Sequence, residues 1–337
     1  MAGLILVVNA GSTSLKLSAV AEDDSAEPVE SLAEAPPVEA VAHRVVHGGA
    51  RFHEPALIDD DVRRELEALA ELAPLHMAPA LEAIDEARRA LPGVPHVAVF
   101  DTAFHATIPE EAFTYAVPQR WREQWGIRRY GFHGLSVAWS AERVPVSRLV
   151  VCHLGGGCSV TAVLDGRSVD TTMGFSPLEG VPMATRPGSI DPEILLYLLR
   201  HDYLSADDLE HALEHESGLL ALGGSARVEE LEASAEPAAR LALDVFAHQV
   251  AGAAARMTAS LGGLDAIVFT AGVGEGSALV RSNICARLGF LGVELDPGLN
   301  KAAIPDAEVA ALDSRVRVWV LHAREDVVAA RAARTVL

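Results

Sequence analysis

Two stretches of the chain share one pattern, in which an apolar run, a polar turn and a second apolar run follow one another. In the first half these segments are 4–8, 9–14 and 15–20, and in the second half they are 148–153, 154–157 and 159–164. Short apolar runs bounded by glycine and serine predict strands joined by a loop. The repetition therefore predicts two similar α/β domains, each with a backbone-rich loop that suits phosphate groups.

The remaining segments show the periodicity and the end signals of further helices and strands. Helices are predicted near Ser136 and over 60–90 (broken near Pro74 and Pro79), 191–199, 237–261, 277–288 and 325–335. Strands are predicted at 266–270 and 315–321, a hairpin turn at Asp165-Gly166, and a surface connection at 22–38. A domain change near Pro145 gives an N-terminal domain of residues 1–146, with a closing helix 323–337 packed back on it, and a C-terminal domain of residues 147–322.

The composition agrees with two folded domains and indicates the cellular compartment in which the protein is expected. The 337 residues exceed what one hydrophobic core usually organises. No apolar run approaches eighteen residues, and the start of the chain lacks the charged region and cleavage site of a signal peptide. Cys152, Cys158 and Cys285 form neither an even disulfide set nor a C-x-x-C metal pair. We expect a cytoplasmic protein with reduced thiols and no membrane partner.

The charge of the chain limits the classes of ligand that it is expected to bind. A formal net charge of −20 argues against a nucleic-acid partner, because a phosphate backbone requires a basic face. Only two of the 27 basic residues are lysines, so Lys16, beside the first turn, indicates a specific role. The segment 9–16 is not a Walker A motif. It is either a simple polar turn or a loop that holds phosphate oxygens and a metal-bound water.

Charged residues also stand at the ends of predicted strands. Arg44 has apolar neighbours on both sides, which favours a ligand-facing side chain over a surface one. Asp101 follows the apolar segment 97–99, where α/β proteins bind ligands, although an aspartate here can also cap a helix. His133 lies among a cation, aromatic residues and glycines in 129–136.

Two turn-rich segments complete the candidate chemistry. The stretch 170–192 consists largely of turn formers and contains a single arginine, Arg186, as catalytic loops often do. The glycine-rich segment 271–276 follows a predicted strand and precedes a predicted helix, a position that suits the phosphates or the sugar of a nucleotide.

Read together and in this order, these segments resemble the acetate and propionate kinase family, within the sugar kinase, Hsp70 and actin superfamily. The matches run from residue 9 to residue 326 and cover nearly the whole chain. The resemblance implies two duplicated α/β domains of the actin and ribonuclease H type that flank a central cleft. It also implies ATP and a small carboxylic acid as substrates, Mg²⁺ or Mn²⁺ as the metal, and a homodimer.

The resemblance further implies a role for each matching residue. The metal-associated residues are Asn9 and Glu325, and the phosphate contacts are Ser12, Ser14 and Lys16. Arg44 contacts the substrate carboxylate, Asp101 is the essential acidic residue, and His133 and Arg186 stabilise the transition state. The phosphate and adenosine loops contribute His153, Gly155, Gly156, Gly157, Ser159, Gly272, Gly274, Glu275 and Gly276. The pocket for the acyl tail contains Val46, Leu75, Phe132 and Pro177.

The chain departs from the family pattern mainly where the nucleotide would bind. Gly156 and Gly276 stand where the family generally has asparagine. The stretch after Ser217 skips an Asp-x-Arg motif, which leaves Arg227 as the counterpart of its arginine. The connection between the first loop and His43 is also shorter than in the family. These differences predict weaker or less selective nucleotide binding beside intact catalytic groups.

The chemistry of a carboxylate acceptor agrees with these roles. A carboxylate has an unperturbed pKa of about 4 and is already ionised at neutral pH, so it needs no general base. Asp101 is therefore expected to organise the metal and water or to orient Arg44. The leading hypothesis is an ATP-dependent acetate or propionate kinase that forms an acyl phosphate. The alternatives are an acyl kinase that uses pyrophosphate, another nucleotide or another small acid, and a catalytically weak paralogue that binds a nucleotide or metabolite.

Overall fold

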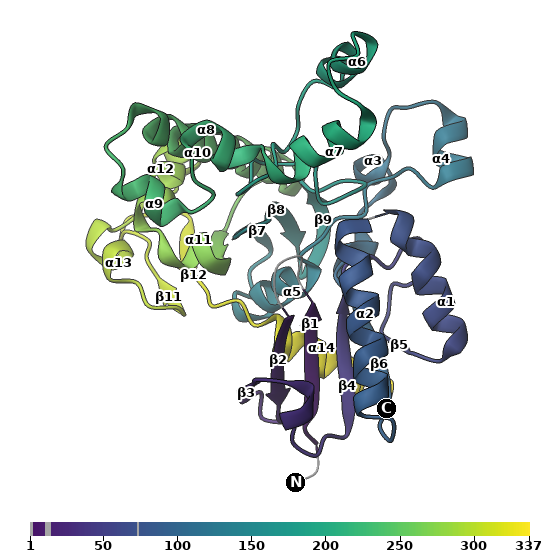
Figure 1. The fold of residues 1–337 in the computed structure, drawn as a ribbon. Helices are drawn as coiled ribbons and strands as arrows, with labels where there is room; N and C mark the ends of the chain where they lie inside the picture. The colour runs from purple at the N-terminus through teal and green to yellow at the C-terminus, as the bar shows by residue number, and fades with distance from the viewer. Residues whose placement is uncertain (1–2, 11–14, 73) are drawn as a thin grey trace. The chain divides into compact units, whose positions relative to one another are not determined.

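The protein, seen in a computed structural model that describes residues 3–10, 15–72 and 74–337, separates into two compact units. Unit 1 comprises Met1–Ala106, Val117–Trp139 and Arg324–Leu337, and unit 2 comprises Thr107–Ala116 and Ser140–Ala323. Each unit is built on one six-stranded sheet with helices packed against it (Figure 1).

The sheet of unit 1 has the strand order β3-β2-β1-β4-β6-β5. Its strands are β1 (Ile5–Ala10), β2 (Leu15–Val20), β3 (Ala26–Val29), β4 (Ala40–Val45), β5 (Ala56–Leu57) and β6 (His96–Phe100). β1, β4 and β6 are parallel, and β2, β3 and β5 run antiparallel to their neighbours. The parallel strands are buried almost throughout, which explains why they are continuous apolar runs in the sequence.

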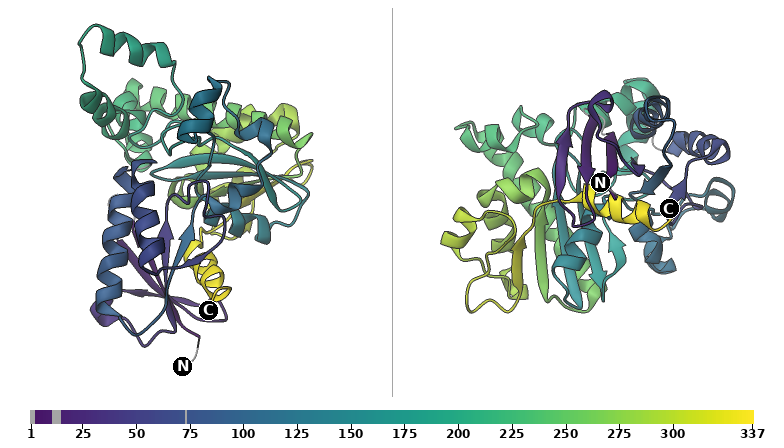
Figure 2. Two further views of the ribbon diagram at one scale, coloured as in Figure 1. Left: turned by 90° about the vertical axis from the view of Figure 1, so that its right-hand side faces the viewer. Right: turned by 90° about the horizontal axis from the view of Figure 1, so that it is seen from below.

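Helices cover both faces of this sheet. α14 (Glu325–Arg334) and the first part of α5 (Gly134–Arg143) pack on one face, and Figure 2 shows α14, in yellow, lying along the strands. α1 (Asp60–Ala68) and α2 (Pro74–Ala90) pack on the other face. The unit is completed by α4 (Gln119–Trp125) and by short 3₁₀ turns at Leu32–Glu34, Leu69–Leu72 and Ala103–Thr107, the last residue of which belongs to unit 2.

The sheet of unit 2 repeats the topology of unit 1. Its order is β11-β12-β10-β7-β8-β9. Its strands are β7 (Arg148–Leu154), β8 (Cys158–Leu164), β9 (Arg167–Thr171), β10 (Ala266–Thr270), β11 (Ala307–Glu308) and β12 (Arg317–Val320). β7, β10 and β12 are parallel, whereas β8, β9 and β11 are antiparallel to their neighbours, as are their counterparts in unit 1. The predicted duplication of one α/β fold is confirmed.

Unit 2 carries most of the helices in the described part of the chain. They are α3 (Glu110–Phe113), α6 (Pro192–Arg200), α7 (Ala206–His215), α8 (Gly218–Gly223), α9 (Val228–Ala233), α10 (Pro237–Leu261), α11 (Ala271–Gly276), α12 (Ala278–Arg287) and α13 (Pro297–Ala302), with a 3₁₀ turn at Gly289–Leu291. α10 is the longest and packs along β7, β8 and β9. No helix among the described residues is long and apolar enough to cross a membrane.

Most predicted elements are confirmed close to their predicted bounds, including α6, α10, α12, α14 and the hairpin turn at Asp165-Gly166, which joins β8 to β9. Both turn residues have positive φ, 48° for Asp165 and 79° for Gly166, as a tight two-residue hairpin requires.

Three local predictions differ from the structure. Pro79 lies inside α2 without breaking it, because Ala80, Ala83 and Ala87 of that helix are buried against the sheet. The predicted surface connection 22–38 contains β3, whose Pro28 is tolerated because the strand lies at the sheet edge. The predicted glycine-rich turn at 271–276 is the short helix α11.

The contacts also divide the chain differently from the expected domain boundary. The unit changes within α5, between Trp139 and Ser140, rather than near Pro145. Residues 107–116 belong to unit 2 because the Thr107 hydroxyl donates to the Ser168 carbonyl at 2.8 Å and the Tyr115 hydroxyl donates to Glu179.

Candidate functional site

Four polar side chains of unit 1 meet at the carboxyl ends of its parallel strands. Asn9 is on β1, Arg44 is on β4, Asp101 directly follows β6, and Glu325 is the first residue of α14. Arg44 Nη2 donates to Asp101 Oδ2 at 2.5 Å, and Arg44 Nε lies 3.7 Å from Glu325 Oε2. Asn9 donates to Glu325 at 3.3 Å and accepts from Arg44 at 3.4 Å. The structure thus brings together four residues that the sequence predicted as functional.

The charged side chains of this cluster are largely buried. The Asp101 side chain is fully buried and the Arg44 side chain is 13% exposed. Burial opposes the charge of Arg44, but the negative charges of Asp101 and Glu325 outweigh it and raise the pKa of Arg44 above its ordinary value. Asp101 Oδ1 has no hydrogen-bond partner among the described residues, although such an atom costs about 1–3 kcal/mol. An oxygen kept in that state suits a bound ligand.

The loop that carries His133 is fastened to Asp101. The backbone N–H of His133 donates to Asp101 Oδ2 at 3.2 Å, and that of Gly134 donates to the Asp101 carbonyl at 2.9 Å. A Cβ at position 134 would lie 2.2 Å from this carbonyl, so only glycine allows the approach. His133 has a φ of 60°, a strained conformation for a residue with a Cβ, and such strain gathers at functional sites.

His105, for which the sequence analysis predicts no role, contacts the same loop at the carbonyl of Phe132. It is 1% exposed, and its Nε2–H donates to the carbonyl of Phe132 at 2.8 Å. Burial lowers the pKa of His105 to about 4, so the ring is neutral at physiological pH. Only its place one turn after Asp101, in an apolar setting, could have indicated a structural role.

The other predicted residues of unit 1 are placed as follows. Lys16 is exposed on β2 and pairs across the ladder with Asn9, so their side chains share one face of the sheet. Val46 and Phe132 are buried, and the ring of His47 contacts that of Phe132 edge-on. Ser12 and Ser14 lie outside the described residues, and the Leu75 side chain lies outside the described side chains.

In unit 2 the first glycine loop forms a tight turn between β7 and β8. The N–H of Gly155 donates to the carbonyl of Gly157 at 3.0 Å, and His153 and Ser159 are buried on the flanking strands. The carbonyl of Gly156 accepts from the N–H of Ala184 at 3.2 Å, which ties this loop to the segment that carries Arg186. A Cβ at position 156 would meet no atom within 4 Å.

Arg186 is 13% exposed and is held by two groups of unit 2. Its Nη1 donates to the carbonyl of the buried Pro177 at 3.0 Å, and its Nε lies 3.4 Å from Oε2 of Glu214. Burial lowers the pKa of Arg186, and the charge of Glu214 counteracts this in part. Glu214, on α7, is a residue that the sequence reasoning missed.

The second glycine segment, α11, is held in place by internal contacts. Arg281 is 2% exposed and donates to the carbonyls of Gly274 and Glu275 at 2.9 and 2.7 Å, which caps the end of this helix. Gly274 packs against β10, whereas Gly272 and Gly276 face open space.

Two residues that are predicted to contact the nucleotide, Glu275 and Arg227, have partners within unit 2. Glu275 accepts from the Ala323 N–H at 2.9 Å, and its other oxygen lies 2.8 Å from His322 Nδ1. Arg227 is a surface residue, 70% exposed, that pairs with Glu230 at 3.4 Å. Among the described residues, the contacts of these two side chains are all with other protein groups.

The cluster of Asn9, Arg44, Asp101 and Glu325 contains side chains that could bind a metal ion. The described residues contain no group of three or more His, Cys, Asp or Glu side chains that could hold a metal. Mg²⁺, however, is usually held by one or two carboxylates together with water and substrate phosphates. Asp101 Oδ1 lacks a partner, and Asn9 and Glu325 add two further oxygen-bearing side chains, so this set fits Mg²⁺.

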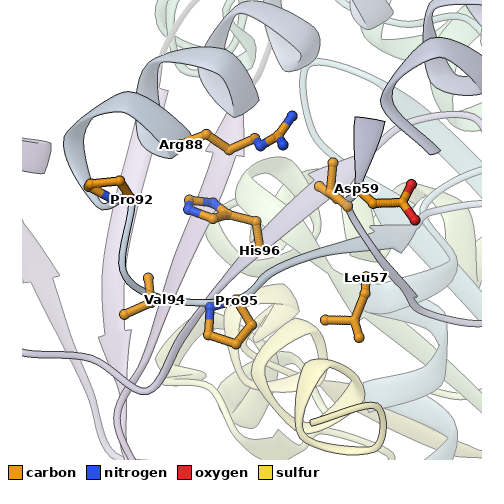
Figure 3. Close-up of a pocket in the computed structure, with 8 residues that line it drawn as sticks. Leu57, Asp59, Arg88, Pro92, Val94, Pro95 and His96 are labelled. Carbon is orange, nitrogen blue, oxygen red and sulfur yellow. The ribbon is translucent and has the colours of Figure 1, made fainter. Parts of the chain in front are cut away.

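A cavity of about 430 Å³ in unit 1 lies away from this cluster (Figure 3). It is lined by Leu57, Ile58, Asp59, Arg88, Pro92, Val94, Pro95 and His96. His96 is the first residue of β6 and Asp101 follows its last, so about 16 Å of strand separates them. The cavity therefore does not belong to the cluster.

A sequence model described as the Acetokinase family matches residues 29–331. An acetate kinase of Protochlamydia amoebophila is 45% identical over 297 residues, which cover 86% of this chain and 75% of that protein. An acetate kinase of Gloeobacter violaceus is 45% identical over 334 residues, 92% of this chain and 81% of that protein. The crystal structure of a propionate kinase from Francisella tularensis superimposes with a TM-score of 0.90 at 32% identity over 98% of both chains.

Proposed function

Because the chain belongs to the acetokinase family, we propose that it transfers the γ-phosphoryl group of ATP to acetate or propionate and forms an acyl phosphate. The observation that carries the proposal is the buried Arg44 and Asp101 pair at the strand ends of unit 1, whose Asp101 Oδ1 lacks a partner among the described residues. A buried ion pair with an unused oxygen contributes little to stability and suits ligand binding.

Arg44 binds the carboxylate of the acid. The acid is ionised at neutral pH and attacks without a base, so the protein's task is to overcome repulsion between two anions. Asp101 and Glu325 hold the Arg44 guanidinium from two sides and keep its remaining edge in one orientation. Val46 and Phe132, both buried in unit 1, contact the short acyl tail.

Arg186 and His133 stabilise the negative charge that spreads over the oxygens of the transferring phosphoryl group. Arg186 is a partly buried arginine, and a charge of this kind can accelerate phosphoryl transfer by about 10³ or more. Mg²⁺ held through Asp101, Asn9 and Glu325 would neutralise phosphate charge during the reaction. Lys16, with Ser12 and Ser14, binds phosphate oxygens.

The nucleotide lies along the loop 153–159 and α11, which offer backbone groups and few side chains. Gly156 and Gly276 each leave open space where a side chain could reach the nucleotide. This observation favours a second donor, such as another nucleoside triphosphate or pyrophosphate, beside ATP.

The decisive experiment traps the acyl phosphate with hydroxylamine across a matrix of short acids and phosphoryl donors in the presence of Mg²⁺. We expect hydroxamate from acetate or propionate with ATP. Asp101→Asn should abolish it, whereas Asp85→Asn, which removes a carboxylate from the Arg63 and Asp85 pair of the same unit, should not. The absence of hydroxamate with every acid and donor would refute the proposal.

We also propose that the protein is a cytoplasmic homodimer. The three cysteines are free and buried, which suits a reducing compartment. α6 has no buried residue, and Ile194, Leu196 and Tyr197 on it are each about half exposed. In a chain with a net charge of −20, such an apolar surface is the part best suited to contact a second copy. Sedimentation of the protein and of Leu196→Glu, which should be a monomer, tests this.

A further inference from the structure

Arg186 is oriented by groups that surround it within unit 2. Its Nη1 donates to the Pro177 carbonyl, and its Nε lies 3.4 Å from Oε2 of Glu214, an ion pair. Nη2 makes no hydrogen bond to any described residue. A planar guanidinium held at two nitrogens has a fixed orientation and presents its third nitrogen to a ligand.

The backbone of Glu214 is held by hydrogen bonds to the loop that carries Arg186. Its carbonyl accepts from the Thr185 hydroxyl at 2.7 Å. Beyond the end of α7, the N–H of Ser217 donates to the Thr185 carbonyl at 2.9 Å, and that of Leu219 donates to the Met183 carbonyl at 2.9 Å. The backbone at Glu214 and just after it is therefore bound to residues 183–185.

Glycine at position 218 permits this close packing. A Cβ there would lie 2.2 Å from the Met183 carbonyl oxygen and 2.7 Å from that of Arg186, and Gly218 has a φ of 63°. The carboxylate of Glu214 and the guanidinium of Arg186 thus belong to one rigid local structure, in which each side chain is about one-seventh exposed.

We propose that Glu214 is a positioning residue of the phosphoryl transfer, which acts by holding the Arg186 guanidinium in the orientation that receives the phosphoryl oxygens. The inference rests on the proposed function, because the role of Arg186 does. The carboxylate acts only while it is ionised, since a protonated carboxyl no longer attracts the guanidinium.

Protonation of Glu214 gives the proposal a measurable signature. Burial raises the pKa of Glu214, and the neighbouring charges of Arg186 and His215 lower it while Glu210 raises it again. The net direction is upward, so Glu214 takes up a proton at a higher pH than an ordinary glutamate. The turnover of the wild-type enzyme should fall as the pH drops through this value, because Arg186 then loses its orientation.

The kinetic test compares Glu214→Ala, Glu214→Gln and Glu210→Gln, the last being a control one turn away on α7 at an exposed position. Glu214→Ala should lower kcat roughly ten- to hundredfold with little change in KM for the acid, as expected for a displaced catalytic group. Glu214→Gln, which retains an acceptor, should recover part of this rate and lose the acidic fall in kcat. Glu210→Gln should keep the wild-type kcat at neutral pH, and its acidic fall should move to lower pH, because the negative charge that raises the pKa of Glu214 is removed.

A second measurement does not depend on activity. The Nε–H signal of Arg186 in ¹⁵N NMR, assigned by its loss in Arg186→Lys, should shift with pH in wild type and remain constant in Glu214→Gln. If wild type forms hydroxamate but Glu214→Gln keeps both the wild-type pH profile and the pH-dependent signal, the inference is wrong. If the signal behaves as expected while wild type forms no hydroxamate, the carboxylate still positions Arg186 and the proposed reaction is wrong. Should Glu214→Ala fail to fold, Glu214→Gln decides the question.

Discussion

The two units share strand order and direction but differ at the positions where chemistry is expected. β1 and β7 occupy equivalent places, as do β4 and β10, and β6 and β12. The last residue but one of β4 is Arg44, whereas that of β10 is Phe269. The first residue after β6 is Asp101, whereas Leu321 follows β12, and both Phe269 and Leu321 are buried.

This difference shows how one fold supports two kinds of site. Unit 1 carries charged side chains on the strand ends themselves, where the backbone is fixed by the sheet. Unit 2 has apolar residues at those strand ends, and its candidate residue Arg186 lies on a segment that connects two elements. The sheet provides rigid positions, and substitutions at a few of them determine what each position does.

The largest expected effect tests the loop-borne arginine of unit 2. Arg186→Ala should lower kcat by about 10² or more with a smaller change in KM for the acid, because its charge acts mainly on the transition state. The control is Arg240→Ala, which removes an exposed arginine of α10 in the same unit and should leave kcat unchanged. A change confined to KM would assign Arg186 to ground-state binding.

The strand-borne arginine of unit 1 should behave differently. Arg44→Ala should chiefly raise KM for the acid, by about tenfold or more, because it removes a contact with the ground-state carboxylate. Removal of Arg44 also leaves Asp101 buried without its partner, a change that can cost about 3–5 kcal/mol of stability. Arg44→Lys retains the charge and, with a melting curve, separates the two effects. Equal losses of kcat in Arg44→Ala and Arg186→Ala would remove the distinction between the units.

The units should also respond to pH in opposite directions. Burial lowers the pKa of His43 to about 3 and that of His105 to about 4, both in unit 1. Below pH 6.5 these histidines are protonated in the unfolded chain but stay neutral in the folded one. The free energy of unfolding of unit 1 therefore falls by up to about 1.4 kcal/mol per pH unit for each histidine. In unit 2, burial raises the pKa of Cys158 and Cys285 to about 12. Above pH 9 the unfolded thiols lose protons that the folded ones keep, so unit 2 loses stability in alkali.

Hydrogen exchange of β6 and β10, corrected for the intrinsic rate at each pH, measures this contrast. β6 should lose protection from pH 7 to pH 5, and His43→Asn should flatten that dependence. β10 should keep its protection in acid and lose it above pH 9. A parallel loss in both strands at both extremes would mean that the units unfold together.

Much of the scaffold could be predicted because local sequence and tertiary burial agree. β1, β4 and β6 are continuous apolar runs, and α10 begins with Pro237 and ends before Gly262, which are strong boundary signals. Prediction failed where tertiary contacts overrode a local signal. Pro28 argues against a strand, but β3 lies at an edge, and Pro79 argues against a helix, but α2 is buried beside it.

Residues of the candidate site could be predicted where their position in the sequence is itself unusual. Arg44 and Asp101 stand out because they interrupt or follow apolar strands. Glu214 and His105 do not, because one is a glutamate on an acidic helix and the other a histidine among apolar residues. They contact Arg186 and Phe132, which lie 28 and 27 positions away along the chain, and only the folded chain brings these pairs together.

The smallest expected effect concerns the glycine loops of unit 2, in which Gly156 and Gly276 offer no side chain to a ligand. Positions 156 and 276 have open space where a Cβ would lie and no positive φ, so asparagine can be introduced at both without strain. Each asparagine could add a hydrogen bond worth about 0.5–1.5 kcal/mol, which corresponds to roughly a two- to twelvefold gain in affinity. The double variant Gly156→Asn with Gly276→Asn should therefore lower KM for ATP while leaving KM for pyrophosphate unchanged, since pyrophosphate has no base or ribose to contact. Gly93→Asn, at an open position in unit 1, is the matched control. Wild-type protein that already binds ATP tightly and rejects GTP in calorimetry would contradict this prediction, because other groups of unit 2 would then supply the contacts that the two glycines lack.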